Sequence, residues 1–97
     1  CIVLDDMVDT GGTLVKVAAK IREQGAFKVY AACVHGVLSG AATDLVEKSD
    51  LEEMILTDSI PVRHLESSKI RVLSIAPLMG EAIARNHQGK SISALFV

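Results

Sequence analysis

The chain has 97 residues, of which 49% are hydrophobic, and a formal net charge of −2. A chain of this length builds one small domain at most, and its charge provides neither a basic surface for nucleic acid nor a cationic helix for a membrane. No apolar run is long enough to span a bilayer and no signal peptide is visible, so we expect a cytoplasmic protein that binds neither nucleic acid nor membrane.

The first part of the chain predicts a strand, a loop and a helix. Residues 1–4 are typical of a short buried strand, and the turn-rich loop 7–13 follows two carboxylates. The next apolar residues recur at the i, i+3, i+4, i+7 spacing of a helix with one buried face. They are Leu14, Val17, Ala18 and Ile21. Gly25 is expected to end this helix.

Strand and helix patterns continue to alternate. Residues 29–34 predict a second strand, residues 41–48 a helix with Leu45 and Val46 facing inward, and residues 54–57 and 70–73 two further strands. The loop from residue 58 to residue 69 separates the last two. Such alternation indicates parallel strands joined by right-handed crossovers. We therefore predict an α/β fold with a doubly wound, mostly parallel sheet.

The end of the chain predicts one more helix. It begins near residue 74 or 75, tolerates Pro77 in its first turn and ends at Gly89. Its apolar face carries Met79, Ala82 and Ile83, followed by Asn86. Residues 91–97 are expected to be extended.

The loop after the first strand is the strongest candidate site. Two glycines let the backbone turn tightly and approach a ligand, while the following helix directs free N–H groups back into the loop. Hydroxyl groups add further donors. Together these groups predict an anion site of phosphate size. Its residues are Asp9, Thr10, Gly11, Gly12 and Thr13.

Asp5 and Asp6 precede this loop. Carboxylates repel phosphate, so they are expected to face sugar hydroxyls or a bridging Mg²⁺ ion. A ligand with a phosphate and neighbouring hydroxyls is a sugar phosphate. The alternative is structural: Asp9 or Thr10 caps the helix and the glycines only make a sharp turn. Three acids before Thr-Gly-Gly-Thr exceed what capping requires, which favours the functional interpretation.

This loop resembles the signature shared by type I phosphoribosyltransferases and 5-phosphoribosyl 1-diphosphate (PRPP) synthetases. The rest of the chain is similar to the C-terminal part of the C-terminal domain of PRPP synthetases, the ribose-phosphate pyrophosphokinase family. The segments that carry the similarity are residues 34–40, 57–61, 73–83 and 91–96. The resemblance implies part of a phosphoribosyltransferase-like domain.

The resemblance also implies an activity. PRPP synthetases transfer the diphosphate of ATP to the C1 hydroxyl of ribose 5-phosphate with Mg²⁺, giving PRPP and AMP for nucleotide biosynthesis. It implies that the Asp9–Thr13 loop holds the 5-phosphate and that Asp5 and Asp6 contact the ribose hydroxyls. The ATP site, most Mg²⁺ ligands and the catalytic Lys and Arg of the family lie upstream. The 97 residues, which begin inside a strand pattern, are therefore expected to be an inactive fragment.

The resemblance extends to regulation and assembly. Family members bind phosphate and ADP at a subunit interface and form hexamers, and Ser91, Ser93 and Phe96 match the tail that contributes to this site. Ala94 departs from the family, where many relatives have an aromatic residue. Two alternatives stay open: a type I phosphoribosyltransferase that uses PRPP, and a non-catalytic PRPP synthetase-associated regulatory subunit.

Other reactive residues favour structural roles. Cys1 and Cys33 lie in apolar strand patterns and are expected to be buried, reduced thiols. His35 stands at a strand end, where backbone groups are expected to satisfy its ring, while His64 and His87 are expected on the surface. No metal-ligand spacing occurs.

Overall fold

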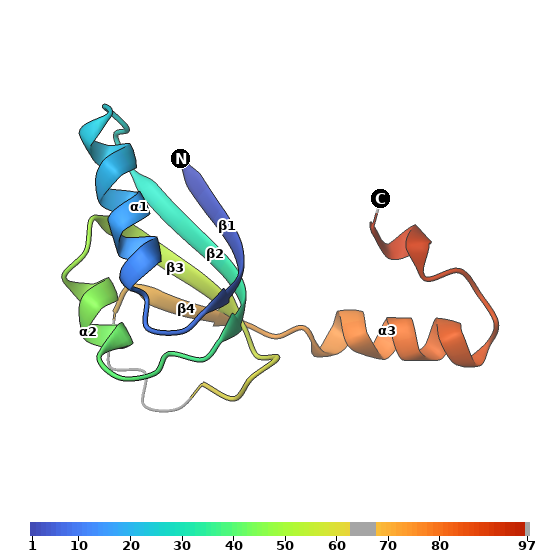
Figure 1. Cartoon of the computed structure of the whole chain (residues 1–97). Helices are drawn as coiled ribbons and strands as arrows, with labels where there is room; N and C mark the ends of the chain where they lie inside the picture. The colour runs from blue at the N-terminus through green and yellow to red at the C-terminus, as the bar shows by residue number, and fades with distance from the viewer. Residues whose placement is uncertain (63–67, 97) are drawn as a thin grey trace.

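The computed structural model describes residues 1–62 and 68–96, and it confirms an α/β fold with a parallel sheet. The four strands lie in the order β1-β2-β3-β4 (Figure 1). Their bounds are β1 Ile2–Val8, β2 Val29–Gly36, β3 Leu51–Thr57 and β4 Ile70–Leu73. The helices are α1 Gly12–Glu23, α2 Ala42–Glu47 and α3 Ala76–His87, and a short 3₁₀ turn, η1, covers Ser93–Phe96.

One face of the sheet holds the hydrophobic core. Helices α1 and α2 pack on this face, with Leu14, Ala18 and Val46 buried against the strands. The largest fully buried side chains are Leu51, Met54, Leu56, Val29 and Val46. Leu and Val are usual core residues of parallel sheets covered by helices. The core therefore supports the carboxyl ends of the strands from one side.

The opposite face of the sheet carries exposed apolar side chains. The strand order advances in one direction, so right-handed crossovers bring α1 and α2 to the same face. On the other face Ile2, Leu4, Val34 and Leu73 are 68%, 77%, 42% and 53% exposed. The prediction of a buried first strand was therefore wrong for this structure, because β1 is an edge strand with this face uncovered.

Several local predictions need correction. β1 continues to Val8, so Asp5 and Asp6 belong to the strand and not to the loop. Leu45, expected to face inward, is 41% exposed, because α2 is short and turns only Ala42 and Val46 inward. The tail expected to be extended forms η1 instead. The 58–69 connection is described only in part, and His64 lies outside the described residues.

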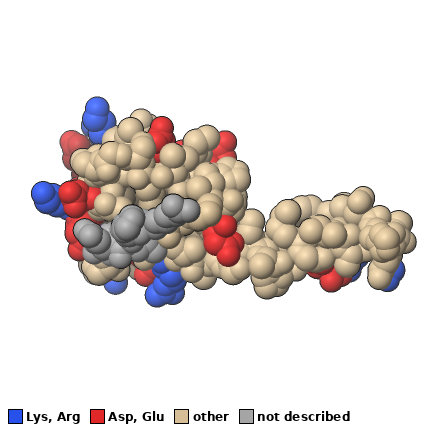
Figure 2. Space-filling model, turned by 90° about the horizontal axis from the view of Figure 1, so that it is seen from below, with Lys and Arg blue, Asp and Glu red and all other residues tan. Residues whose placement is uncertain are grey.

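Helix α3 projects from the sheet as an arm (Figure 1). None of its residues is buried, and its surface in Figure 2 is mostly uncharged. The radius of gyration is 15.6 Å, whereas a compact chain of this length has about 12.5 Å. Asp58 anchors the start of the arm by accepting a 2.9 Å hydrogen bond from the Ile75 N–H. This bond lowers the pKa of the Asp58 carboxyl.

The described residues include no helix that is both long and apolar enough to cross a membrane. Cys33 is a buried thiol, as predicted, whereas Cys1 is exposed. Burial and then the charges of Asp5 and Asp6 raise the pKa of Cys33 from 9.0 to about 11. The thiol therefore stays protonated at neutral pH.

Gly36 allows a close approach between β2 and the side chain of Leu56. A Cβ atom at Gly36 would lie 2.7 Å from Leu56 Cδ1, and Leu56 is fully buried. Gly36→Ala should therefore lower the free energy of unfolding by about 1–3 kcal/mol through overpacking. Gly80→Ala is the control, since open space surrounds Gly80 in α3 and the substitution should stabilise that helix by about 0.5–1 kcal/mol. Urea unfolding measures the stability of both variants. Equal unfolding midpoints for Gly36→Ala and Gly80→Ala would contradict the packing argument.

The raised pKa of Cys33 predicts a pH dependence of stability. An unfolded thiol releases its proton near pH 9.0, whereas the folded thiol keeps it up to about pH 11. The contribution of Cys33 is thus complete below pH 9.0 and is lost as the pH rises to about 11. Thermal unfolding midpoints of the wild type should fall more steeply over this range than those of Cys33→Ala. Parallel profiles would show that the thiol is not shifted.

Candidate functional site

The junction between β1 and α1 forms a pocket at the carboxyl edge of the sheet. β1 ends at Val8, and α1 starts at Gly12 after only three residues. Gly11 makes this turn with a φ of 83°, in the left-handed region that glycine adopts without strain. The pocket has a volume of about 280 Å³. It is lined by Asp5, Met7, Val8, Asp9, Thr10, Gly11, Thr13 and Leu14.

The first turn of α1 leaves backbone donors at this pocket. The first hydrogen bond of the helix runs from Val15 N to Gly11 O, at 3.0 Å. The N–H groups of residues 12–14 precede it and have no partner within the helix. No side chain caps the N-terminus of α1. The capping role considered for Asp9 and Thr10 is therefore not what these residues do in this structure.

One carboxylate, that of Asp5, lies on the strand side of the pocket. Asp5 lines it directly, whereas Asp6 is the next residue of β1 and is not among the lining residues. Both are exposed, and Asp5 Oδ1 accepts a 2.8 Å hydrogen bond from Asp6 N. Successive residues of a strand point to opposite faces. The structure thus separates two carboxylates that the sequence suggested as a pair.

The loop between β2 and α2 holds Asp9 in place. Ser39 N donates a 3.0 Å hydrogen bond to Asp9 O, and Ser39 Oγ donates to Asp9 Oδ1. Val37 N also donates to Val8 O, at 2.9 Å. Sequence reasoning did not identify Ser39 as a site residue. The available signal was its place after the neighbouring strand, since the carboxyl ends of adjacent parallel strands meet at one edge.

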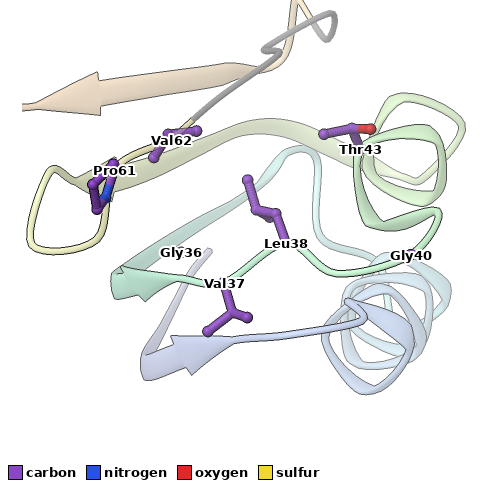
Figure 3. Close-up of a pocket in the computed structure, with 7 residues that line it drawn as sticks. All are labelled: Gly36, Val37, Leu38, Gly40, Thr43, Pro61 and Val62. Atoms are coloured by element: carbon purple, nitrogen blue, oxygen red, sulfur yellow. The ribbon is translucent and has the colours of Figure 1, made fainter.

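A second pocket lies beside the first, between the β2–α2 loop, the start of α2 and the segment after β3 (Figure 3). Its volume is about 370 Å³. Leu38, at its centre in Figure 3, has a φ of 53°, which is uncommon for a residue other than glycine. Its lining residues are Gly36, Val37, Leu38, Gly40, Thr43, Pro61 and Val62. None of these side chains carries a charge.

His35 also lies at the carboxyl edge of the sheet, and its partner differs from the expected backbone groups. Its Nδ1 lies 2.7 Å from Ser59 Oγ. Ser59 Oγ in turn donates to Val34 O, at 3.1 Å. The ring is therefore oriented by a side chain from the segment after β3. Such a contact between residues 24 positions apart arises only from the tertiary fold.

The tail residues lie away from this edge, beyond α3 (Figure 1). Ser91 Oγ and Ser93 Oγ are 2.7 Å apart, and Arg85 Nη1 donates to Ser91 O at 3.1 Å. Phe96 is 76% exposed. Within residues 1–62 and 68–96, no group of three or more His, Cys, Asp or Glu side chains could hold a metal ion.

Comparison with known proteins finds similarity along the whole chain. Residues 1–97 match the family model described as the phosphoribosyl synthetase-associated domain. The chain is 54% identical to a ribose-phosphate pyrophosphokinase of Hyphomonas neptunium, across 99% of this chain and 31% of that protein. It is 49% identical to one of Bordetella pertussis, across 99% of this chain and 32% of that protein.

A solved structure is similar as well. The phosphoribosylpyrophosphate synthetase of Mycobacterium smegmatis superposes with a TM-score of 0.86 at 38% identity, covering 92% of this chain and 30% of that one. The chain thus spans about a third of the length of these relatives. The matched description is of an associated domain, and it does not support the position in the C-terminal part of a C-terminal domain that the resemblance implied. From its full-length match, the chain belongs to the phosphoribosyl synthetase-associated domain family.

Proposed function

We propose that this chain is part of a ribose-phosphate pyrophosphokinase and that its β1–α1 pocket binds ribose 5-phosphate. The observation that carries this proposal is one pocket with helix-start amides at one end and an exposed carboxylate at the other. The complete enzyme would transfer diphosphate from ATP to the C1 hydroxyl of the sugar, releasing AMP. The names of the relatives support this reaction.

The amide end of the pocket suits a phosphate. Free N–H groups and the positive end of the α1 dipole attract an anion, and the hydroxyls of Thr10 and Thr13 add donors. Gly11 and Gly12 let the backbone approach the phosphate oxygens without a Cβ between them. Asp9 is the one acid in this loop, and its bond from Ser39 offsets part of its repulsion toward a bound anion.

The strand end of the pocket suits hydroxyl groups. Asp5 is an acceptor with no positively charged partner among the ion pairs of the described residues. A carboxylate accepts hydrogen bonds from neighbouring hydroxyls and repels a second phosphate. A sugar phosphate therefore has one preferred direction in the pocket, with its phosphate at α1 and its ring over β1. Fixing the acceptor sugar in this way is a large part of phosphoryl-transfer catalysis.

The remaining machinery would come from outside these 97 residues. We propose that the chain is part of a larger domain, and the exposed apolar face of the sheet supports this. The ATP site, most Mg²⁺ ligands and the basic catalytic residues would lie in the other part of the enzyme. When bound, Mg²⁺ would neutralise the diphosphate charge. The 97 residues alone are accordingly expected not to form PRPP.

Regulation and assembly stay predictions. We propose that Ser91, Ser93 and Phe96 contribute to a site for phosphate or ADP between subunits of a hexamer in the cytoplasm. The exposure of Phe96, which lies in η1 after α3, supports contact with another chain. The alternative of a type I phosphoribosyltransferase is less well supported, because the relatives reported above are named as pyrophosphokinases and synthetases. A regulatory subunit would differ by lacking turnover.

Asp5→Asn tests the direction of the sugar. Loss of the charge should weaken ribose 5-phosphate binding about tenfold, the effect of one charge-assisted hydrogen bond. Affinity for inorganic phosphate should stay the same or rise, because a nearby negative charge is removed. Isothermal titration calorimetry measures both ligands. Asp50→Asn is the control, since Asp50 is exposed at the opposite, amino-terminal edge of the sheet. Equal losses of ribose 5-phosphate affinity in Asp5→Asn and Asp50→Asn would refute the role assigned to Asp5.

A further inference from the structure

His35 and Ser59 form a hydrogen-bonded pair in which the direction of the Ser59 hydroxyl is coupled to the tautomer of the ring. Ser59 has one hydroxyl proton, and both Val34 O, at 3.1 Å, and His35 Nδ1, at 2.7 Å, lie within its reach. When the proton goes to Val34 O, the contact between Ser59 Oγ and His35 Nδ1 takes its proton from the ring. In the neutral imidazole this places the proton on Nδ1. The other nitrogen, Nε2, is then a hydrogen-bond acceptor.

The segment that carries Ser59 is itself held firmly. Thr57 Oγ1 donates a 2.6 Å hydrogen bond to the same Val34 O, and Ser59 N donates to Thr57 Oγ1 at 3.3 Å. Asp58 N donates to Leu73 O, at 3.1 Å. The turn after β3 thus fixes Ser59 relative to the ends of three strands. A free surface serine would not orient a histidine in this way.

The position of His35 relates it to the candidate pocket. His35 pairs with Met7 across the parallel strands β1 and β2. Paired strands lie about 4.8 Å apart, and Met7 is one of the residues that line the pocket. His35 is exposed at this edge. Its backbone therefore lies one strand away from the strand side of the pocket, although His35 is not itself among the lining residues.

We propose that His35 is a ligand-positioning residue whose Nε2 accepts a hydrogen bond from a sugar hydroxyl of the ligand in the β1–α1 pocket. The inference rests on the proposed function. A neutral acceptor suits this place, because it can bind a hydroxyl without the repulsion that another carboxylate would exert on the phosphate. Asp5 and His35 would then hold the ring from two neighbouring strands.

Two substitutions at His35 distinguish the role of Nδ1 from that of Nε2. In His35→Asn, the side-chain amide keeps the donor to Ser59 and removes the acceptor at the Nε2 position. In His35→Gln, the amide oxygen reaches the Nε2 position and restores an acceptor. We expect His35→Asn to weaken ribose 5-phosphate binding about tenfold, and His35→Gln to recover part of this loss. Neither should change the affinity for inorganic phosphate, which contacts only the amide end.

The tautomer can be observed directly. Two-dimensional ¹⁵N–¹H spectra of the histidine rings in the 97-residue chain should show a protonated Nδ1 and an unprotonated Nε2 for His35. Ser59→Ala should shift this ring toward the Nε2-protonated tautomer, and ribose 5-phosphate should move the wild-type Nε2 resonance. A ring that is protonated on Nε2 in the wild type at neutral pH would overturn the inference before any binding is measured.

The binding outcomes distinguish this inference from the proposed function. Wild-type protein that binds neither inorganic phosphate nor ribose 5-phosphate would overturn both. Wild-type affinity for ribose 5-phosphate in His35→Asn, with Asp5→Asn still impaired, would overturn the role of His35 alone. Loss of inorganic phosphate binding in both His35 variants would show that the His35–Ser59 pair has a structural role, and it would also overturn the ligand-positioning role of His35. Partial recovery of ribose 5-phosphate affinity in His35→Gln, compared with His35→Asn, supports the inference.

Discussion

The left-handed turn at Gly11 is the constraint on which the candidate site depends. It converts β1 into α1 within three residues, so the strand that carries Asp5 and the helix with free amides meet at one pocket. A side chain at this φ would be strained, although no atom lies closer than 3.9 Å to the place of its Cβ. The conformation of the backbone, and not crowding, explains the glycine.

Parallel pairing extends this junction into a shared edge. Because β2 lies beside β1 in register, the loop after β2 reaches the loop after β1, where Ser39 binds Asp9. The turn after β3 adds Ser59, which orients His35. Each of these contacts joins the carboxyl end of one strand to that of its neighbour. The site is thus a property of the sheet edge, which is where open α/β sheets generally bind ligands.

The two faces of the sheet have different environments. Helices α1 and α2 cover one face, while apolar residues such as Leu4 and Val34 remain exposed on the other. Helix α3 leaves the sheet with no buried residue. The chain spans about a third of the length of its relatives, and the proposal that it is part of a larger domain would account for this asymmetry. The pocket lies at the edge and depends on the covered face for its support.

The sequence by itself determined the elements and the loop. The spacing of Leu14, Ala18 and Ile21 indicated α1, and the Thr-Gly-Gly-Thr turn after three acids identified the loop, because helix periodicity and glycine turns are local properties. Only the tertiary structure decided that β1 is an edge strand, that Asp5 lines the pocket while Asp6 does not, and that Ser39 and Ser59 orient Asp9 and His35. These outcomes depend on strand order and register, which bring together residues distant in the chain and leave no periodic signal in the sequence.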